Sequence, residues 1–133
     1  MRLYLQDIGR VDLLTSEEEV TLARLVQRRE ALLKQQRELS DTNPAIGELH
    51  RLEELQRREA NHHSHWPTKQ EWARAAGLTL QELQSRIDAG YEAWADKAAI
   101  DAKGLKVSLR NGRRAKDHMI QANLRLVVAV AKK

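Results

Sequence analysis

Three copies of a Thr-x-x-Glu pattern constrain the fold of this chain more than any other feature. They lie at Thr15 and Glu18, at Thr68 and Glu71, and at Thr79 and Glu82. In such a capping box the hydroxyl accepts from the glutamate N–H and the carboxylate accepts from the threonine N–H, which satisfies free donors at a helix start. Each copy therefore predicts the beginning of an α-helix.

Apolar spacing extends the first of these starts into a long helix, expected over residues 16–39. The breaker at residues 40–44 ends it. In a second helix apolar residues recur at three-residue steps from Ile46 to Leu55, among many Glu and Arg residues. This pattern indicates a solvated arm, which the segment 61–67 brings to an end.

Residues 68–87 have the rhythm of a helix-turn-helix motif, with a short helix over 69–76, a turn at Gly77 and a second capped helix. The second helix of such a motif can enter a DNA major groove. Its face carries a single cation, Arg86, whereas phosphate contacts need several. We therefore expect a structural helical hairpin here.

The last helix is expected to begin near Arg113, after a looser connection marked by glycines at 104 and 112. It carries two apolar stripes, one through Ala115 and Met119 and one through Ile120 and Leu124. A helix that is apolar on two sides is expected to be buried on both. Because little of this chain remains to cover it, we expect the cover to lie in a longer parent protein.

Composition favours an all-α fold and excludes several classes of function. Aromatic residues make up 4% of the chain and Phe is absent, which favours helices over sheets. The absence of cysteine excludes disulfides and thiolate metal sites and indicates a reducing compartment. The longest apolar run, residues 126–131, is far shorter than the ~20 residues that cross a bilayer, so no membrane partner is expected.

Neither a metal centre nor an enzyme active site is predicted. His62, His63 and His65 lack a carboxylate at ligand spacing and lie at an expected helix end, so we interpret them as a solvated linker. No nucleotide-binding loop, nucleophile arrangement or pair of buried acids is recognisable. We therefore expect a protein without a metal or cofactor and without catalytic activity.

Positive charge leaves nucleic acid open as a partner. The net charge is +4, and the densest basic cluster is Arg110, Arg113, Arg114 and Lys116. This cluster either follows phosphates or solvates the start of the last helix. Because arginine opposes the dipole at a helix N-terminus, the second interpretation needs another favourable contact there.

The N-terminal residues have the side chains that hold unpaired bases. Arg2, Tyr4 and Gln6 combine a stacking ring with guanidinium and amide donors, although the residues alone favour an amphipathic helix docked on a neighbour. Glu17 and Glu19 lie in the first turn of a helix, where acidic side chains complement the macrodipole. A carboxylate there can also accept a hydrogen bond from the amino group of a base.

Two separated blocks resemble one family. The block RLYLQDIGRVDLLTSEEEVTLARLVQ resembles region 1.2 of bacterial sigma factors of the primary and closely related classes, and GRRAKDHMIQANLRLVVAVAKK resembles the start of their region 2. The phrases TKQEWARAAGL and GRRAKD are similar to sigma factors of cyanobacteria or plastids. The resemblance implies an all-α helical bundle fragment with long helices and a helical-hairpin spacer. Its parts are region 1.2 (1–39), a variable spacer (40–111) and region 2.1 (112–133), cut within its domain.

The resemblance also implies a function in transcription initiation. Sigma factors join core RNA polymerase and hold the unpaired non-template strand of the −10 element and of the discriminator. Positions implied to contact the discriminator are Arg2, Tyr4, Leu5, Gln6, Ile8 and Arg125, and those implied to form the −10 base pocket are Leu13, Glu17, Glu19, Asn123 and Leu126. The expected partners are core RNA polymerase, single-stranded promoter DNA, and anti-sigma or other regulators. The bacterial cytoplasm is expected ahead of a plastid stroma.

An alternative function stays open. The chain is then a helical interaction module whose spacer binds a transcription regulator or the polymerase without binding DNA itself. The first hypothesis predicts that Glu19→Ala or Asn123→Ala abolishes DNA binding. The second predicts that these changes have no effect and that surface changes within residues 45–100 abolish partner binding.

Overall fold

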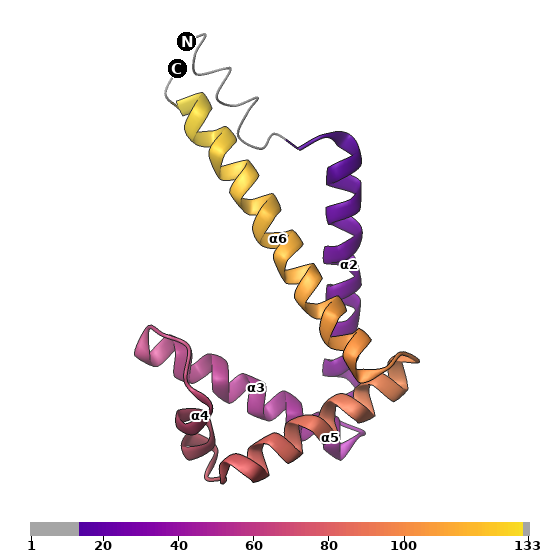
Figure 1. Ribbon diagram of the computed structural model, residues 1–133, viewed down its shortest axis with the longest axis vertical. Coiled ribbons are helices and arrows are strands. Elements are labelled where there is room, and N and C mark those ends of the chain that lie inside the picture. Colours follow the sequence, from indigo (N-terminus) through magenta and orange to yellow (C-terminus); the bar gives the residue numbers. More distant parts are fainter. Residues whose placement is uncertain (1–13, 132–133) are drawn as a thin grey trace. The chain divides into compact units, whose positions relative to one another are not determined.

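The computed structural model describes residues 14–131, and for residues 125, 126 and 129–131 it describes the backbone only. Figure 1 shows its helices, which are α2 (Ser16–Leu39), α3 (Pro44–His63), α4 (Lys69–Ala76), α5 (Leu80–Ala98) and α6 (Ala102–Ala131). This part of the chain contains no strand, so the predicted all-α class is confirmed. None of these helices is both long and apolar enough to cross a membrane.

All three predicted capping boxes are formed. The Glu18 N–H donates to the Thr15 hydroxyl at 3.1 Å, and the Thr15 N–H donates to the Glu18 carboxylate at 3.3 Å. The same reciprocal pair begins α4 and α5. The Thr68 N–H holds the pKa of the Glu71 carboxyl below its usual range, and the Thr79 N–H does the same for Glu82. The bounds predicted for α2 and α4 agree with the structure because caps and breakers are local signals.

The chain divides into two compact units. The first unit combines the chain up to Ala31 with the chain from Val107 onward, and the second unit is Leu32–Lys106. Helices α2 and α6 each contribute to both units, whereas α3, α4 and α5 lie in the second unit alone.

Helix α3 lies at the centre of the second unit, and the prediction of a solvated arm was wrong. Ile46, Leu49 and Leu52 are fully buried, because residues three apart form one face and α3 packs that face against α4 and α5. The Glu and Arg residues solvate only the remaining faces. The other fully buried side chains of this core are Leu83, Trp94 and Leu105.

Gly90 allows α3 and α5 to approach closely. A Cβ atom at Gly90 would lie 2.4 Å from the Leu49 Cβ and 3.0 Å from the Ala45 carbonyl oxygen. The glycine that interrupts the apolar face of α5 in sequence is therefore the point at which the two helices meet.

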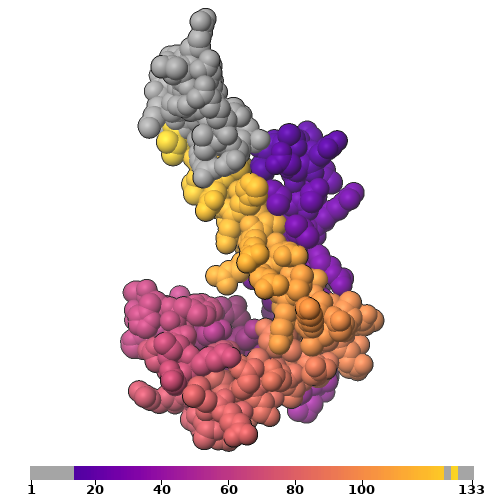
Figure 2. All heavy atoms as spheres, viewed as in Figure 1, coloured from indigo at the N-terminus to yellow at the C-terminus, as the bar shows by residue number. Residues whose placement is uncertain are grey.

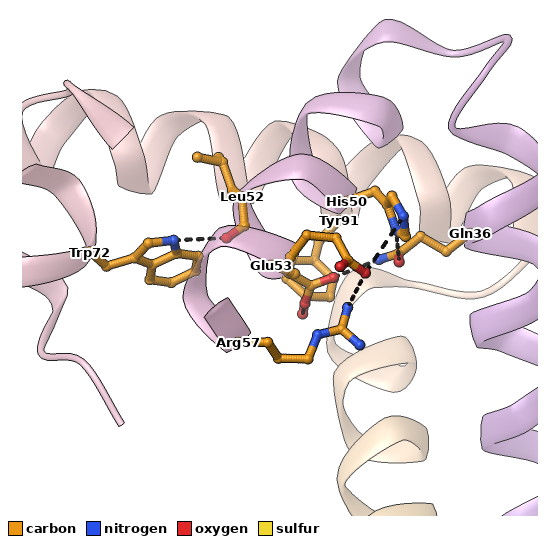
Figure 3. A network of polar contacts seen from close by, with 8 residues as sticks. Gln36, His50, Leu52, Glu53, Arg57, Trp72 and Tyr91 are labelled. Atoms are coloured by element: carbon orange, nitrogen blue, oxygen red, sulfur yellow. Dashed lines mark hydrogen bonds and ion pairs between the residues drawn. The ribbon is translucent and has the colours of Figure 1, made fainter. Parts of the chain in front are cut away.

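A network of hydrogen bonds joins the end of α2 to α3 and α5 (Figure 3). The buried Gln36 amide donates to the Glu53 carboxylate at 2.7 Å, and its oxygen lies 3.0 Å from the His50 Nδ1. The Tyr91 hydroxyl donates to the other Glu53 oxygen at 3.1 Å. Burial, followed by the charge of Glu53, raises the pKa of the Tyr91 phenol well above its ordinary value.

Tyr91→Phe is expected to remove part of the alkaline pH dependence of stability. Because the pKa of Tyr91 is higher in the folded chain, its contribution to stability is complete below pH 10.0 and is lost as the pH rises beyond it. The variant should lose about 1–2 kcal/mol at neutral pH, since Glu53 loses a donor. Urea unfolding between about pH 8 and about pH 11 checks this. If the free energies of unfolding of the two proteins fell in parallel as the pH rose, the prediction would be contradicted.

Helix α6 begins at Ala102, so the prediction of a looser connection and of a helix start near Arg113 was wrong. The Asp101 carboxylate accepts from the Gly104 N–H at 2.6 Å, and Leu105 is fully buried. These contacts outweigh the cost of a glycine in a helix, about 1 kcal/mol. The predicted stripe through Ala115 and Met119 lies on the inner side of the helix, where Ala115 and Ala122 are buried. The Ile120 and Leu124 side chains of the other stripe are exposed.

Candidate nucleic-acid interface

Helices α2 and α6 cross closely within the first unit. A Cβ atom at Gly112 would lie 2.4 Å from the Arg29 Cβ and 2.7 Å from the Leu25 carbonyl oxygen. From this crossing the two helices separate toward the start of α2 (Figure 1). Hollows lie between the first half of α2 and the part of α6 from Asn111 to Asn123.

One of these hollows contains two of the predicted site residues. Glu19 of α2 and Asn123 of α6 line an open groove of about 320 Å³, which we call the Glu19–Asn123 groove. Its other lining residues are Leu14, Val20, Ala23 and Met119. Figure 2 shows the indigo side chains of α2 beside the orange-to-yellow ones of α6 in this unit. The groove is thus built from side chains that lie at opposite ends of the sequence.

The lining of this groove suits a flat, polar-edged ligand. A carboxylate accepts hydrogen bonds, and an amide both donates and accepts them. The remaining side chains are apolar and can pack on the face of a ring. Glu19 and Asn123 are both exposed, so a ligand can reach both side chains. Such a lining can recognise the edge of an unpaired base.

The other predicted site residues divide into two groups. Glu17 lines a different hollow, together with Glu18 and His118. The remaining predictions lie outside the described residues or side chains: Arg2, Tyr4, Leu5, Gln6, Ile8 and Leu13 in the chain before residue 14, and the side chains of Arg125 and Leu126 in α6.

The basic cluster lies in the middle of a helix rather than at its start. Arg110, Arg113, Arg114 and Lys116 are all exposed on α6, which begins at Ala102. The predicted conflict between these cations and a helix dipole therefore does not arise, since the dipole acts within the first and last turns.

The histidines at the end of α3 form aromatic contacts with one another. The His62 and His63 rings meet edge-on at 4.8 Å, and His63 stacks on His65 at 5.8 Å. In the part of the chain that the structure describes, no group of three or more His, Cys, Asp or Glu side chains is placed to hold a metal ion.

Sequence reasoning missed several residues that line these hollows. Met119 was assigned to an apolar stripe of the last helix, and Val20, Ala23 and His118 were not predicted as site residues. Their signal was available, because Met119 lies four residues before Asn123 and therefore on the same side of α6. What the spacing lacks is any indication that this side of α6 faces the start of α2.

Comparisons with known proteins place this all-α chain in a family. Residues 1–32 match the model of the sigma-70 factor, region 1.2. An RNA polymerase sigma-C factor of Nostoc sp. is 42% identical over 138 aligned positions, which cover all of this chain and 32% of the relative. The sigma factor SigA2 of Synechococcus elongatus is 40% identical, over all of this chain and 28% of the relative.

The resemblance inferred from the sequence is thereby confirmed: residues 1–32 match region 1.2 of the sigma-70 factor, and cyanobacterial sigma factors align with this chain over its whole length. A more distant relative, SigA of Nostoc sp., is 35% identical over all of this chain and 23% of its own length. The chain spans about a third of the length of the curated sigma-C and SigA2 relatives. No solved structure gives a significant match.

Proposed function

We propose that the chain acts in transcription initiation as part of a sigma factor, in the bacterial cytoplasm and in complex with core RNA polymerase. In this role it binds the unpaired non-template strand of the −10 element and the discriminator. The role is one of binding rather than catalysis. The relatives support it, since they are sigma factors that match along the whole chain.

The observation that carries the DNA-binding part is the shared groove of Glu19 and Asn123. Both polar residues share the groove with apolar side chains, and this lining fits a base whose face packs on Val20 or Met119 while its edge is read by hydrogen bonds. The exposed arginines of α6 add the positive charge that attracts a DNA strand.

Asn123→Ala and Glu19→Ala are expected to abolish sequence preference in DNA binding. A good bidentate contact contributes about 1–3 kcal/mol of discrimination between bases, so the preference should fall by about 5- to 100-fold. The measurement is the fluorescence anisotropy of a labelled single-stranded oligonucleotide with a −10 element and discriminator, compared with a scrambled one at two salt concentrations.

Matched controls are available on the same helices. Gln121→Ala removes an exposed amide of α6, and Glu38→Ala removes an exposed carboxylate of α2, both outside the groove. These variants should keep the preference. If the unmodified chain bound both oligonucleotides equally and in a salt-sensitive way, the binding would be electrostatic attraction without base recognition. That result would favour the alternative of a protein-interaction module.

A further inference from the structure

A second groove lies between α2 and α6 and shares no lining residue with the Glu19–Asn123 groove. It consists of two hollows, of about 450 and about 200 Å³, that both include Leu22 and His118. We call it the His118 groove. Its α2 side runs from Thr15 to Leu25, about 15 Å at 1.5 Å per residue, which corresponds to nearly three helical turns.

The floor of the His118 groove is apolar. Leu22 and Leu25 contribute from α2 and Ala115 contributes from α6. Both leucines are only half-buried, so part of their apolar surface remains in contact with water. A ligand that covered this surface would gain the free energy of removing it from water.

The two ends of the groove carry opposite charges. Glu17 and Glu18 line the end at the start of α2, and Arg114 lines the end near the helix crossing. Arg28 lies three residues after Leu25, one turn further along the same side of α2, and is exposed. Glu17, Glu18 and Arg114 are all exposed, so a ligand in the groove can reach their side chains.

These features select among classes of ligand. A nucleic-acid strand is negative along its whole length, so Glu17 and Glu18 would repel its phosphates at this end of the groove. A helix that carries acidic side chains at one end and basic ones at the other matches both ends. A groove between two helices accepts the apolar face of a third, with anchors at positions i, i+3 or i+4, and i+7.

We propose that the His118 groove binds an amphipathic helix of a partner protein. The acidic side chains of that helix lie over Arg114 and Arg28, its basic ones lie over Glu17 and Glu18, and its leucine-type side chains cover Leu22 and Leu25. The His118 groove includes Glu17 but shares no lining residue with the Glu19–Asn123 groove, so the proposal does not rest on base recognition by Glu19 and Asn123.

The test uses three labelled synthetic helical peptides with the same leucine spacing. The mixed peptide has two glutamates at one end and two lysines at the other, and the controls have glutamates or lysines at both ends. In anisotropy titrations of the full chain, the mixed peptide should bind about three- to tenfold tighter than either control, since each end gains exposed ion pairs. Arg114→Glu should reverse the order, so that the lysine-ended peptide binds best.

Arg113→Glu is the matched control, because it changes an exposed neighbour on α6 that does not line the groove, and it should leave the order unchanged. Circular dichroism checks that both variants keep their helices. Equal binding of the three peptides, or no binding at millimolar concentration, would overturn the proposal. So would an unchanged order in Arg114→Glu, and displacement of the mixed peptide by an oligonucleotide would indicate a nucleic-acid site instead.

Discussion

Replacing Trp94 by alanine is expected to lower the free energy of unfolding by about 3–5 kcal/mol. Trp94 is completely buried in the second unit, and its ring stacks on Tyr91 with the centroids 5.8 Å apart. Alanine would leave a cavity that the surrounding helices fill only in part. Because small domains are stable by about 5–15 kcal/mol, this loss is a large share of the total.

The matched control for this substitution is Trp66→Ala. Trp66 is the same residue type but is 54% exposed, in the turn between α3 and α4. A surface change of this kind should alter stability by about 0.5 kcal/mol or less. Urea unfolding followed by circular dichroism at 222 nm measures both. Equal losses in the two variants would contradict the burial assigned to Trp94.

Trp94→Phe separates packing from hydrogen bonding at the same site. The Trp94 indole N–H is buried and has no hydrogen-bond partner in the described part of the chain. Phenylalanine keeps most of the ring and removes this donor, whose burial without a partner is unfavourable. The loss should therefore be clearly smaller than in Trp94→Ala.

The parts of the fold that the sequence predicted depend on local chemistry. A hydroxyl and a carboxylate three residues apart determine where α4 starts, and the breaker after Leu39 determines where α2 ends. Local rules failed in α6, where the glycines at 104 and 112 predicted a loop. Tertiary packing decides that stretch, since Leu105 is buried in the second unit and Gly112 touches α2 in the first.

The candidate site was predicted only in part, for a related reason. Periodicity assigned Glu19 to the start of one helix and Asn123 to another, but it contains no information on which helices meet. The family resemblance supplied that pairing, and the structure brings the two residues to one groove. The network of Gln36, Glu53 and Tyr91 has no comparable signal, because its members come from three helices.

The close approach of α2 and α6 at Gly112 provides a test of how the first unit is held together. Gly112→Ala is expected to lower the free energy of unfolding by about 1–3 kcal/mol, the usual cost of overpacking. Helix propensity alone would predict the opposite, a gain of about 1 kcal/mol. The added Cβ would meet the Leu25 backbone oxygen at 2.7 Å and the Arg29 Cβ at 2.4 Å. A backbone atom cannot rotate away, so the helices must move apart.

Gly104→Ala is the control, since it adds the same atom to the same helix. Its Cβ would meet only the Asp101 carboxylate, at 2.6 Å, and the end of a side chain can rotate away. The hydrogen bond from the Gly104 N–H to Asp101 would then be lost, but the gain in helix propensity, about 1 kcal/mol, offsets this loss, so stability should change little. In Gly112→Ala the added Cβ must move to a normal contact of about 3.5–4.0 Å from the Arg29 Cβ, so the helices must separate by about 1 Å or more. This separation widens the Glu19–Asn123 groove.

The widened groove gives Gly112→Ala a second measurable effect. Sequence preference in the oligonucleotide assay should fall in this variant and persist in Gly104→Ala. Because the chain has no cysteine, spin labels can be attached to single cysteines introduced at Arg24 and Gln121, which are exposed on the two helices. Their separation should lengthen in Gly112→Ala only. If the two glycine variants behaved alike in stability, label distance and DNA preference, the close crossing at Gly112 would not control the groove.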